Sequence, residues 1–421
     1  GCRPRGPLIG ALLFLATMNV TATPAGTSGD RYGEVLAADA DTLAIGVPAF
    51  QIDLGSGPEP VGAVFVYART NGRWVREALL TAPPGFVSDS FFGASVALSG
   101  DRLLVGHPAA SVAAGTIQGA AHLYERTGAT WNLARTLSGG TDPGADPVDN
   151  FGAAVALAGD TAVVGAPLDD VGNTGAAGSV YVYTRSGSDW TQSARLVAAD
   201  AAANHGAGAA VALSGNTVLV GTLRAPGVVH VWVRNNAQWG QQATLSATDQ
   251  TPLDSFGQHL AVDGDIALVG ATLQPGSPTV GERGAVYAFR RNGANWTQEA
   301  KLQPPGPPRT GQYGRVALLG ERALVGAPTS AVDGIPFRGQ AYLYERGNGA
   351  WPLRQVVLPR NAPEPQTAFG QAVALAPGLA FIGAPTTTVD GDSVRGVVQT
   401  CIGAADAGVG TTLDSDSGIS T

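Results

Sequence analysis

Short runs of alternating apolar and polar residues recur along the whole chain, and each run has the length of a β-strand. Between residues 152 and 196 these runs are GAAVALA, TAVVGAP, GSVYVYTR and WTQSARL. Side chains on a strand point alternately to its two faces, so short period-two runs bounded by Gly, Asp and Asn indicate strands joined by tight turns. The pair Gly159-Asp160 between the first two runs is typical of a two-residue type II′ hairpin. The four runs therefore predict a four-stranded antiparallel sheet.

This four-run unit occurs seven times. A glycine, often within Gly-Ala-Pro, closes the second run of each unit: Gly46, Gly106, Gly165, Gly221, Gly270, Gly326 and Gly383. Another glycine, usually preceded by an aromatic residue, opens the first run: Gly33, Gly93, Gly152, Gly208, Gly257, Gly314 and Gly370. A repeated unit that cannot bury both faces alone must stack on its neighbours. The pattern predicts an all-β fold, a single seven-bladed β-propeller of four-stranded antiparallel blades.

The fourth run carries two further signals. A Trp opens it and a Leu follows six residues later, as at Trp190 and Leu196. An even offset predicts that both side chains lie on one face of the strand. An Arg lies five residues before each Trp, which predicts that Arg and Trp face each other across the hairpin between third and fourth strands. These arginines are Arg69, Arg126, Arg185, Arg234, Arg291 and Arg346.

The seventh unit lacks the run that begins with Trp, so we expect an incomplete seventh blade. Two segments compete to complete it: residues near Asn19–Thr23, or the C-terminal stretch Gly408–Leu413. We expect three strands with at most a short fourth from the C-terminal tail. The third strand of this blade, Gly396–Cys401, should then exchange its amide hydrogens fastest.

Composition and charge narrow the function. Charged residues are 14% of the 421 residues, the net charge is −8, and Lys301 is the only lysine. No basic stripe exists to neutralise phosphates, so we expect no nucleic-acid partner. Arg3 and Arg5 precede the apolar run Leu8–Ala16, and small residues follow, as in a secretory signal peptide. The expected organisation is a signal peptide over residues 1–25, the propeller over 26–403 and a polar tail over 404–421.

Export has a consequence for the cysteines. The chain contains Cys2 and Cys401. Removal of residues 1–25 leaves Cys401 alone, so no internal disulfide is expected. Export without disulfides is typical of a bacterial periplasmic or extracellular protein, and no stable membrane span is expected after cleavage.

The motifs resemble the FG-GAP repeats of the integrin α-chain propeller, and more closely those of bacterial secreted FG-GAP proteins. The resemblance rests on seven ordered copies, including SGSDWTQSARL and NGANWTQEAKL, and covers roughly Asp30 to Gly403. Integrin blades place calcium loops between the first and second strands. Here that position holds turns such as SGD and AGD, which are too short to wrap an ion. We therefore expect neither calcium nor any other metal or cofactor.

Candidate ligand residues lie in the connections between second and third strands and between one blade and the next, which share one face of a propeller. The candidates are Asp142, Asp146, Asp169, Asp170, Asp333, Asp390 and Asp392. The alternative role for such aspartates is to cap local turns. The five histidines show no metal-ligand spacing. His122 and His230 fall on third strands and are expected to be part of the framework.

These observations favour a non-catalytic, monomeric binding or adhesion-type propeller that presents loops to a protein or glycan. Two alternatives stay open: an enzyme acting on polysaccharide as a lyase or glycosidase, and a structural cell-envelope component. Polar groups converging on the central channel would indicate an enzyme. The inner strands SVALS, AVALA, AVALS and HLAVD offer almost nothing ionisable, and no Ser-His-Asp arrangement has local support.

Overall fold

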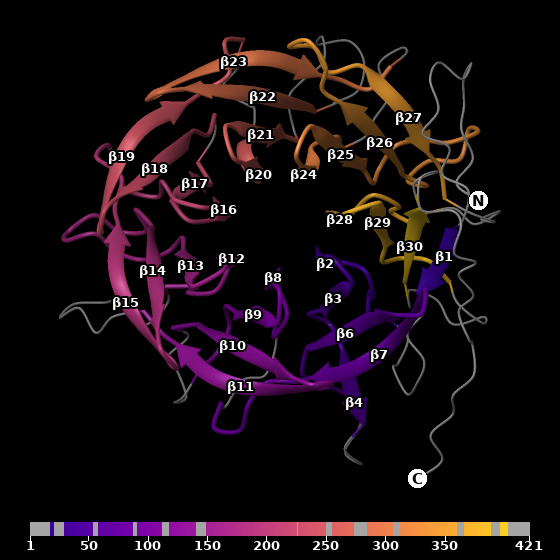
Figure 1. The fold of residues 1–421 in the computed structure, drawn as a ribbon, viewed down its shortest axis with the longest axis horizontal. Coiled ribbons are helices and arrows are strands. Elements are labelled where there is room, and N and C mark those ends of the chain that lie inside the picture. Colours follow the sequence, from indigo (N-terminus) through magenta and orange to yellow (C-terminus); the bar gives the residue numbers. More distant parts are fainter. Residues whose placement is uncertain are drawn as a thin grey trace.

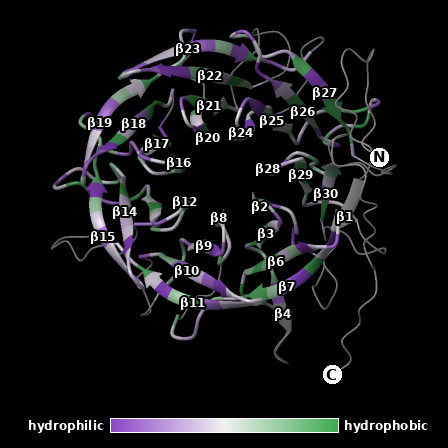
Figure 2. Cartoon of the chain, viewed as in Figure 1, coloured by the Kyte–Doolittle hydropathy of each residue, from purple (hydrophilic) through white to green (hydrophobic). Residues whose placement is uncertain are grey.

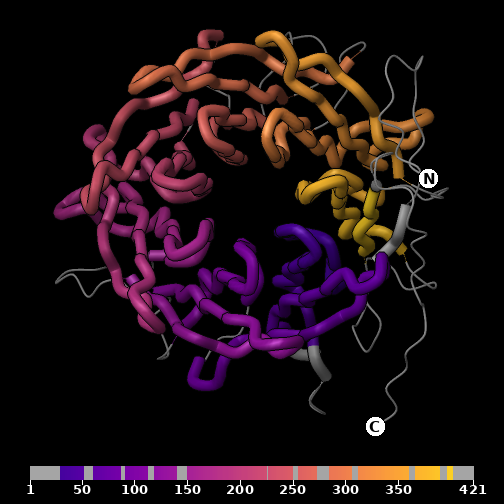
Figure 3. Tube along the Cα trace, viewed as in Figure 1, coloured from indigo at the N-terminus to yellow at the C-terminus, as the bar shows by residue number. Residues whose placement is uncertain are grey.

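Seven four-stranded antiparallel sheets form a closed ring around a central channel (Figure 1). The computed structural model describes residues 17–20, 29–53, 58–86, 91–111, 118–139, 149–224, 226–249, 255–272, 284–305, 312–359, 366–388 and 396–402. The trace runs once around the ring, which brings its earliest and latest blades together (Figure 3). The prediction of an all-β, seven-bladed propeller is confirmed.

Each blade runs from an innermost strand at the channel to an outermost strand at the rim. The first three blades contain β2 (Val35–Asp39), β3 (Thr42–Val47), β6 (Ala63–Thr70) and β7 (Arg73–Leu80); β8 (Ser95–Ser99), β9 (Arg102–His107), β10 (Ala120–Thr127) and β11 (Thr130–Leu137); and β12 (Ala154–Ala158), β13 (Thr161–Ala166), β14 (Ser179–Ser186) and β15 (Asp189–Leu196). A small hairpin, β4 (Gln51–Asp53) with β5 (Pro58–Pro60), projects from the first blade.

The next three blades follow the same order. They contain β16 (Ala210–Ser214), β17 (Thr217–Gly221), β18 (Val229–Asn235) and β19 (Gln238–Leu245); β20 (Phe256–Asp263), β21 (Ile266–Ala271), β22 (Ala285–Asn292) and β23 (Asn295–Leu302); and β24 (Arg315–Leu319), β25 (Arg322–Ala327), β26 (Gln340–Glu345) and β27 (Leu353–Val357). The seventh unit supplies β28 (Val373–Ala376), β29 (Leu379–Ala384) and β30 (Val397–Ile402).

The second strand of every blade is buried throughout or nearly so, whereas the outermost strands carry mainly exposed and half-buried residues. Hydrophilic and hydrophobic residues are mixed along the rim (Figure 2). Residues of the second strands pack against both neighbouring blades. The hydrophobic core is therefore divided into clusters that lie between adjacent blades. No blade has a core of its own, which explains why the unit must repeat.

Two glycines meet at every interface between blades. A Cβ at the glycine that ends each second strand would overlap the carbonyl oxygen of the glycine that opens the next blade. The seven pairs are Gly46 with Gly93, Gly106 with Gly152, Gly165 with Gly208, Gly221 with Gly257, Gly270 with Gly314, Gly326 with Gly370, and Gly383 with Gly33. The repeated glycines of the sequence thus allow backbone to touch backbone.

The Trp and the Leu of the fourth strand lie on opposite faces of their sheet, so the prediction of a shared face is wrong. Trp190 packs with residues of the preceding blade such as Leu123, whereas Leu196 packs with residues of the following blade such as Val218. The reason is a β-bulge between them. The register shift leaves one residue of the outer strand unpaired, and the extra residue turns an even spacing into an odd one. The five interfaces between the first and sixth blades each contain a Leu from one blade and a Trp from the next.

The bulged residue lies three positions after the Trp, and in three blades it reaches the following blade. Glu77 on β7 accepts a hydrogen bond from the indole Nε1 of Trp131, at 3.2 Å. Glu299 accepts in the same way from Trp351, and Gln242 from Trp296. In the second blade this position is Ala134, and Nε1 of Trp190, in the third blade, has no hydrogen-bond partner among the described residues.

The repeated arginines face their tryptophans across the hairpin, as predicted: Arg126 pairs with Trp131, and its guanidinium carbon lies 5.4 Å from the indole centre. The same side chain also reaches Asp101 in the turn between first and second strands, with Nη2 2.7 Å from Oδ1. Arg291 repeats this contact with Asp265. Each arginine therefore ties the inner turn of its blade to the outer hairpin.

The seventh blade is completed from the other end of the chain. Its own unit supplies three strands, so the expectation of an incomplete seventh unit is confirmed. The outer position is taken by β1 (Thr17–Val20), which pairs antiparallel with β30 from Thr17↔Cys401 to Val20↔Val398 (Figure 1). The favoured source, the C-terminal tail, lies outside the described residues. The competing N-terminal segment supplies the strand instead.

The position of β1 bears on two other expectations. It lies inside the predicted signal peptide, so a molecule cleaved after residue 25 would lack this strand. Cys401 is buried on β30 and disulfide-bonded, and the only other cysteine in the sequence is Cys2. The expectation of no internal disulfide concerns a chain without residues 1–25 and stays a prediction for that form.

The glycine contact predicts that Gly165→Ala lowers the free energy of unfolding by about 3 kcal/mol, because neither backbone can move without opening an interface. Gly240→Ala is the matched control, since an added Cβ there meets nothing within 4 Å and φ is not positive. Urea denaturation of both variants checks this. Equal midpoints for the two variants would contradict it.

The unpartnered indole predicts that Ala134→Gln stabilises the protein by about 1 kcal/mol, because the new amide oxygen can accept from Trp190 Nε1 as Gln242 does from Trp296. Ala134→Leu adds length without an acceptor and serves as the control. Thermal denaturation is the measurement. A gain in both variants would mean that added apolar contact, not the hydrogen bond, is responsible.

The closing strand predicts that removal of residues 1–25 accelerates amide hydrogen exchange in β30 and leaves β14 unchanged, because only β30 loses a partner strand. Cys2→Ser in the full-length chain separates the loss of the disulfide from the loss of the strand. Equal protection of β30 with and without residues 1–25 would show that β1 does not close the ring.

Candidate functional site

The two faces of the ring are built from different connections. On one face, first and second strands are joined by two-residue turns in all seven blades. On the other, the connections between second and third strands range from 222–228 in the fourth blade to 48–62 in the first. This second surface, together with the connections between blades, is called the loop face below. Loops held by a regular framework are the usual place for recognition.

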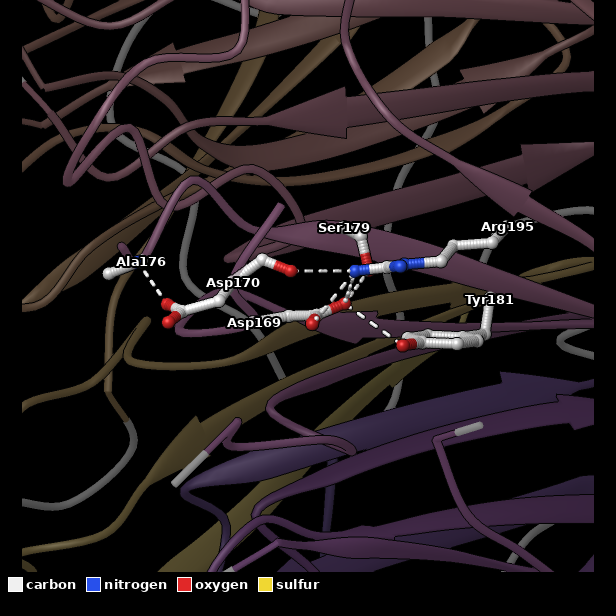
Figure 4. A network of polar contacts seen from close by, with 6 residues as sticks. All are labelled: Asp169, Asp170, Ala176, Ser179, Tyr181 and Arg195. Carbon is white, nitrogen blue, oxygen red and sulfur yellow. Dashed lines mark hydrogen bonds and ion pairs between the residues drawn. The ribbon is translucent and has the colours of Figure 1, made fainter. Parts of the chain in front are cut away.

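Asp169 forms the centre of a polar network on the loop face of the third blade (Figure 4). Its carboxylate accepts hydrogen bonds from the hydroxyl groups of Tyr181 and Ser179. Nη2 of Arg195 lies 2.9 Å from both carboxylate oxygens and also donates to the carbonyl of Asp170. The side chain of Asp169 is only 4% exposed. This carboxylate holds the loop against strands β14 and β15 and is turned away from solvent.

The guanidinium of Arg195 also lies over the ring of Tyr181, 5.7 Å from its centre. Burial, and then the adjacent carboxylate of Asp169, raises the pKa of the Tyr181 hydroxyl, which therefore stays protonated and donates. The network balances one cation with one anion and satisfies both carboxylate oxygens. Its chemistry is that of a structural clamp.

Asp170 and Asp333 are turn residues. Oδ1 of Asp170 accepts from the backbone N–H of Ala176 at 2.7 Å, which is the capping role weighed for these aspartates. Asp333 occupies the two-residue turn between Val332 and Ile335 with φ of +53°, and its carboxylate is 3.9 Å from Arg338. A ligand role for these side chains stays a prediction. Four other candidates lie outside the described residues: Asp142, Asp146, Asp390 and Asp392.

A related network in the fifth blade was not predicted. Asp249 accepts from the hydroxyl of Tyr287 at 2.8 Å and pairs with the ammonium of Lys301 at 2.5 Å, and Lys301 lies over the Tyr287 ring. Partial burial disfavours the charged carboxylate of Asp249. The hydrogen bonds from Lys301 and Tyr287 together outweigh this effect, so the pKa of Asp249 is lowered. The sequence did contain a sign of this network, because Tyr181 and Tyr287 occupy equivalent positions in their units. Each tyrosine pairs with a cationic residue on the next strand, Arg195 and Lys301 respectively.

The histidines of the second blade meet although their spacing gave no sign of it. His107 Nδ1 lies 3.3 Å from Nε2 of His122, and Nδ1 of His122 is 3.1 Å from the hydroxyl of Thr136. Both imidazoles are fully buried and contact the rings of Phe86 and Phe92. Burial, and then the neighbouring His107, lowers the pKa of His122 to about 3. The framework role predicted for His122 agrees with this packing.

The end of the channel on the loop face is more polar than predicted. Arg315 opens β24, and its Nη1 lies 2.5 Å from Nε2 of His259 on β20. Glu34 lies at the start of β2, and Gln371 just before β28. The expectation that inner strands offer almost nothing ionisable is wrong here. These residues come from separate units, so no single repeat of the sequence shows them together.

Two general findings limit the chemistry. Within the part of the chain that the structure describes, three or more His, Cys, Asp or Glu side chains nowhere gather as a metal site would require. The described residues also form no helix long and apolar enough to cross a membrane.

Comparison with known families agrees with the fold. The family described as FG-GAP repeat matches residues 74–124, 141–183, 190–227 and 239–289. Three of the four matches begin in the outermost strand of one blade and continue into the inner strands of the next, so the repeat of the sequence crosses the interface. No curated protein matches the chain. The chain therefore contains FG-GAP repeats within a ring of seven blades, which fits a propeller of the integrin-alpha-like kind.

The buried histidine pair predicts a pH dependence of stability. The pKa of His122 is depressed on folding, so the unfolded chain binds more protons than the native one between about pH 6.5 and 3. Stability should therefore fall as the pH drops through this window, by on the order of 1 kcal/mol per pH unit for this group.

His122→Phe places at this site the residue type that the first blade has at Phe65. It should reduce the dependence, and His230 and His259, whose pKa values are also lowered, should supply the rest. Melting temperatures of both proteins between pH 7 and 4 are the measurement. Parallel curves for wild type and variant would contradict the assignment to His122.

Proposed function

We propose that this protein is an exported, non-catalytic binding or adhesion-type propeller that presents its loop face to a protein or glycan ligand. The fold is compatible with such a role, and FG-GAP repeats occur in extracellular and cell-surface proteins. Residues that serve binding can be recognised when the fold does not need them. The proposal rests on one observation of this kind on the loop face.

Two exposed phenylalanines occupy positions that favour small or polar residues. Phe91 has φ of +69° and Phe337 has φ of +56°, and their side chains are 55% and 49% exposed. A left-handed conformation is unfavourable for a bulky residue and is tolerated best by Gly and Asn. The blades that share the position of Phe91 carry Arg31, Asn150, Gly206 and Ala368, all with positive φ.

The framework therefore requires the left-handed backbone conformation at these positions, but it does not require the phenyl rings. Phe337 corresponds to Ala176 of the third blade, which has φ of +49°. A phenyl ring that is unfavourable for the backbone and contributes little buried area gains nothing from folding. Apolar side chains of this type, displayed on loops, act as anchors when a partner covers them. This argues for contact with a ligand through the loop face.

The proposal predicts that Phe91→Asn with Phe337→Asn reduces ligand capture by at least about tenfold, because two anchors are removed. The melting temperature should stay the same or rise, since Asn adopts the left-handed conformation more readily. The readouts are a glycan array and a pull-down from extracellular material with the purified protein.

Leu133→Asn on β11 is the matched control, because Leu133 is also exposed, at 43%, but lies on the rim. It should leave capture unchanged. Capture by the double variant equal to that of wild type would overturn the proposed role of the loop face.

A further inference from the structure

The outer edge of the seventh blade is covered by a short strand from the other end of the chain. Four residues of β1 pair with β30, whereas the outermost strands of the first five blades are eight residues long and follow their third strands after a two-residue turn. The residues of β30 from Val398 to Cys401 are at most 3% exposed. β30 is therefore built as an inner strand, and the blade needs a further strand outside it.

The two faces of β30 pack against different blades. Val398 belongs to the cluster that contains Trp74 and Phe381, between the seventh and first blades. Cys401 belongs to the cluster that contains Val357, between the sixth and seventh blades. Side chains alternate between the faces of a strand, so a strand paired with β30 directs every second residue toward each of these two apolar clusters.

One position of the outermost strand is apolar in every blade. It is the residue paired with the third-strand partner of the glycine that ends the second strand. In the first six blades this residue is Leu80, Leu137, Leu196, Leu245, Leu302 or Val357. Val20 has the same register in the seventh blade, opposite Val398. Any strand that completes this blade should therefore carry an apolar residue opposite Val398.

β1 belongs to the segment that export would remove, because residues 1–25 have the pattern of a secretory signal peptide. A chain without them keeps β30 with an unpaired row of backbone N–H and C=O groups between two apolar clusters. In the other six blades a bulge interrupts the pairing of the outermost strand, whereas the pairing of β30 with β1 is regular. A regular, unpaired edge accepts an added strand most readily.

We propose that the edge of β30 in the exported chain binds an extended segment of a partner protein, which joins the seventh blade as its fourth strand. The segment runs antiparallel to β30, as β1 does. It carries apolar residues opposite Val398 and Thr400 and a polar residue opposite Gln399, the same alternation as Thr-Met-Asn-Val in β1. The inference rests on the export in the proposed function and adds a second binding surface, at the rim.

The chemistry of the edge selects a peptide. Backbone N–H and C=O groups alternate along β30 at the spacing of another strand, so main-chain hydrogen bonds supply the affinity. Specificity comes from the alternate side chains. Thr400 pairs with Phe381 and so shares the apolar face of Val398, whereas the amide of Gln399 donates to the carbonyl of Leu358 in the sixth blade. This difference between the faces explains the alternation of apolar and polar residues.

The test uses the protein recovered after export, and its probe is a synthetic peptide of residues 14–23. Mass spectrometry first establishes the N-terminus of the exported protein. The peptide should then bind in one-to-one stoichiometry by calorimetry. It should slow amide hydrogen exchange in β30 at least about tenfold and leave β14 unchanged. The full chain, purified without export, should not bind the peptide, because β1 already occupies the edge.

Two changed peptides test the register. Val20→Asp places a charge opposite Val398, beside an apolar cluster, and should weaken binding at least about tenfold. Thr23→Asp adds the same charge beyond the four paired positions and should bind like the parent peptide. Selection from a library of random decapeptides should enrich sequences in which two apolar residues flank a polar one, and these peptides should also protect β30.

The outcomes distinguish the edge of β30 from the loop face. Binding and protection that the Val20→Asp peptide loses support the edge. Absence of binding, or equal binding of the parent and Val20→Asp peptides, overturns it. An exported protein that retains residues 17–20, or whose β30 is as protected without peptide as in the full chain, also overturns it, because the chain then fills the edge itself. Phe91→Asn with Phe337→Asn should leave peptide binding unchanged, so loop-face binding and edge binding fail or stand separately.

Discussion

The contact between two backbones at each interface is the constraint on which the ring depends. A glycine that ends the second strand of one blade meets a glycine that opens the next, and neither position can accept a Cβ. Because the contact involves no side chain, it recurs in all seven interfaces, including Gly383 with Gly33 where the ring closes. Only Gly314 differs in conformation, with φ of +151° against +85° to +98° for the other six. Uniform spacing near the channel lets each blade take the same angle to its neighbour.

The outer part of each interface is built differently. There the spacing between blades is wider, and side chains fill it: Trp from one blade, Leu from the other, and a bulged residue that reaches across. The inner contact tolerates no substitution, whereas the outer one is variable, with Glu77, Gln242 and Glu299 in some blades and Ala134 in another. Stability is therefore set by a fixed inner contact and adjusted by a variable outer one.

The sequence allowed the repeat, the strands and the hairpins to be predicted, because each is encoded within one unit. Gly165, Trp190 and Arg185 show their roles through recurrence alone. The bulge was missed because an extra residue in a strand leaves no compositional mark, and so Trp190 and Leu196 were assigned to one face. Contacts between units were missed as well. Arg315 and His259 are separated by a whole blade in the sequence, and Arg195 reaches Asp169 only once β14 and β15 have paired.

The bulge has one more consequence, which concerns association between molecules. An outermost strand presents a row of unpaired backbone N–H and C=O groups, and such a row can template the addition of a strand from another chain. In six blades the bulge breaks this row near its middle and twists the strand, so no long flat edge is offered. Only the edge formed by β1 is regular, and it is four residues long. The same irregularity that points a side chain at the next blade also protects the rim of a weakly charged protein against growing into fibrils.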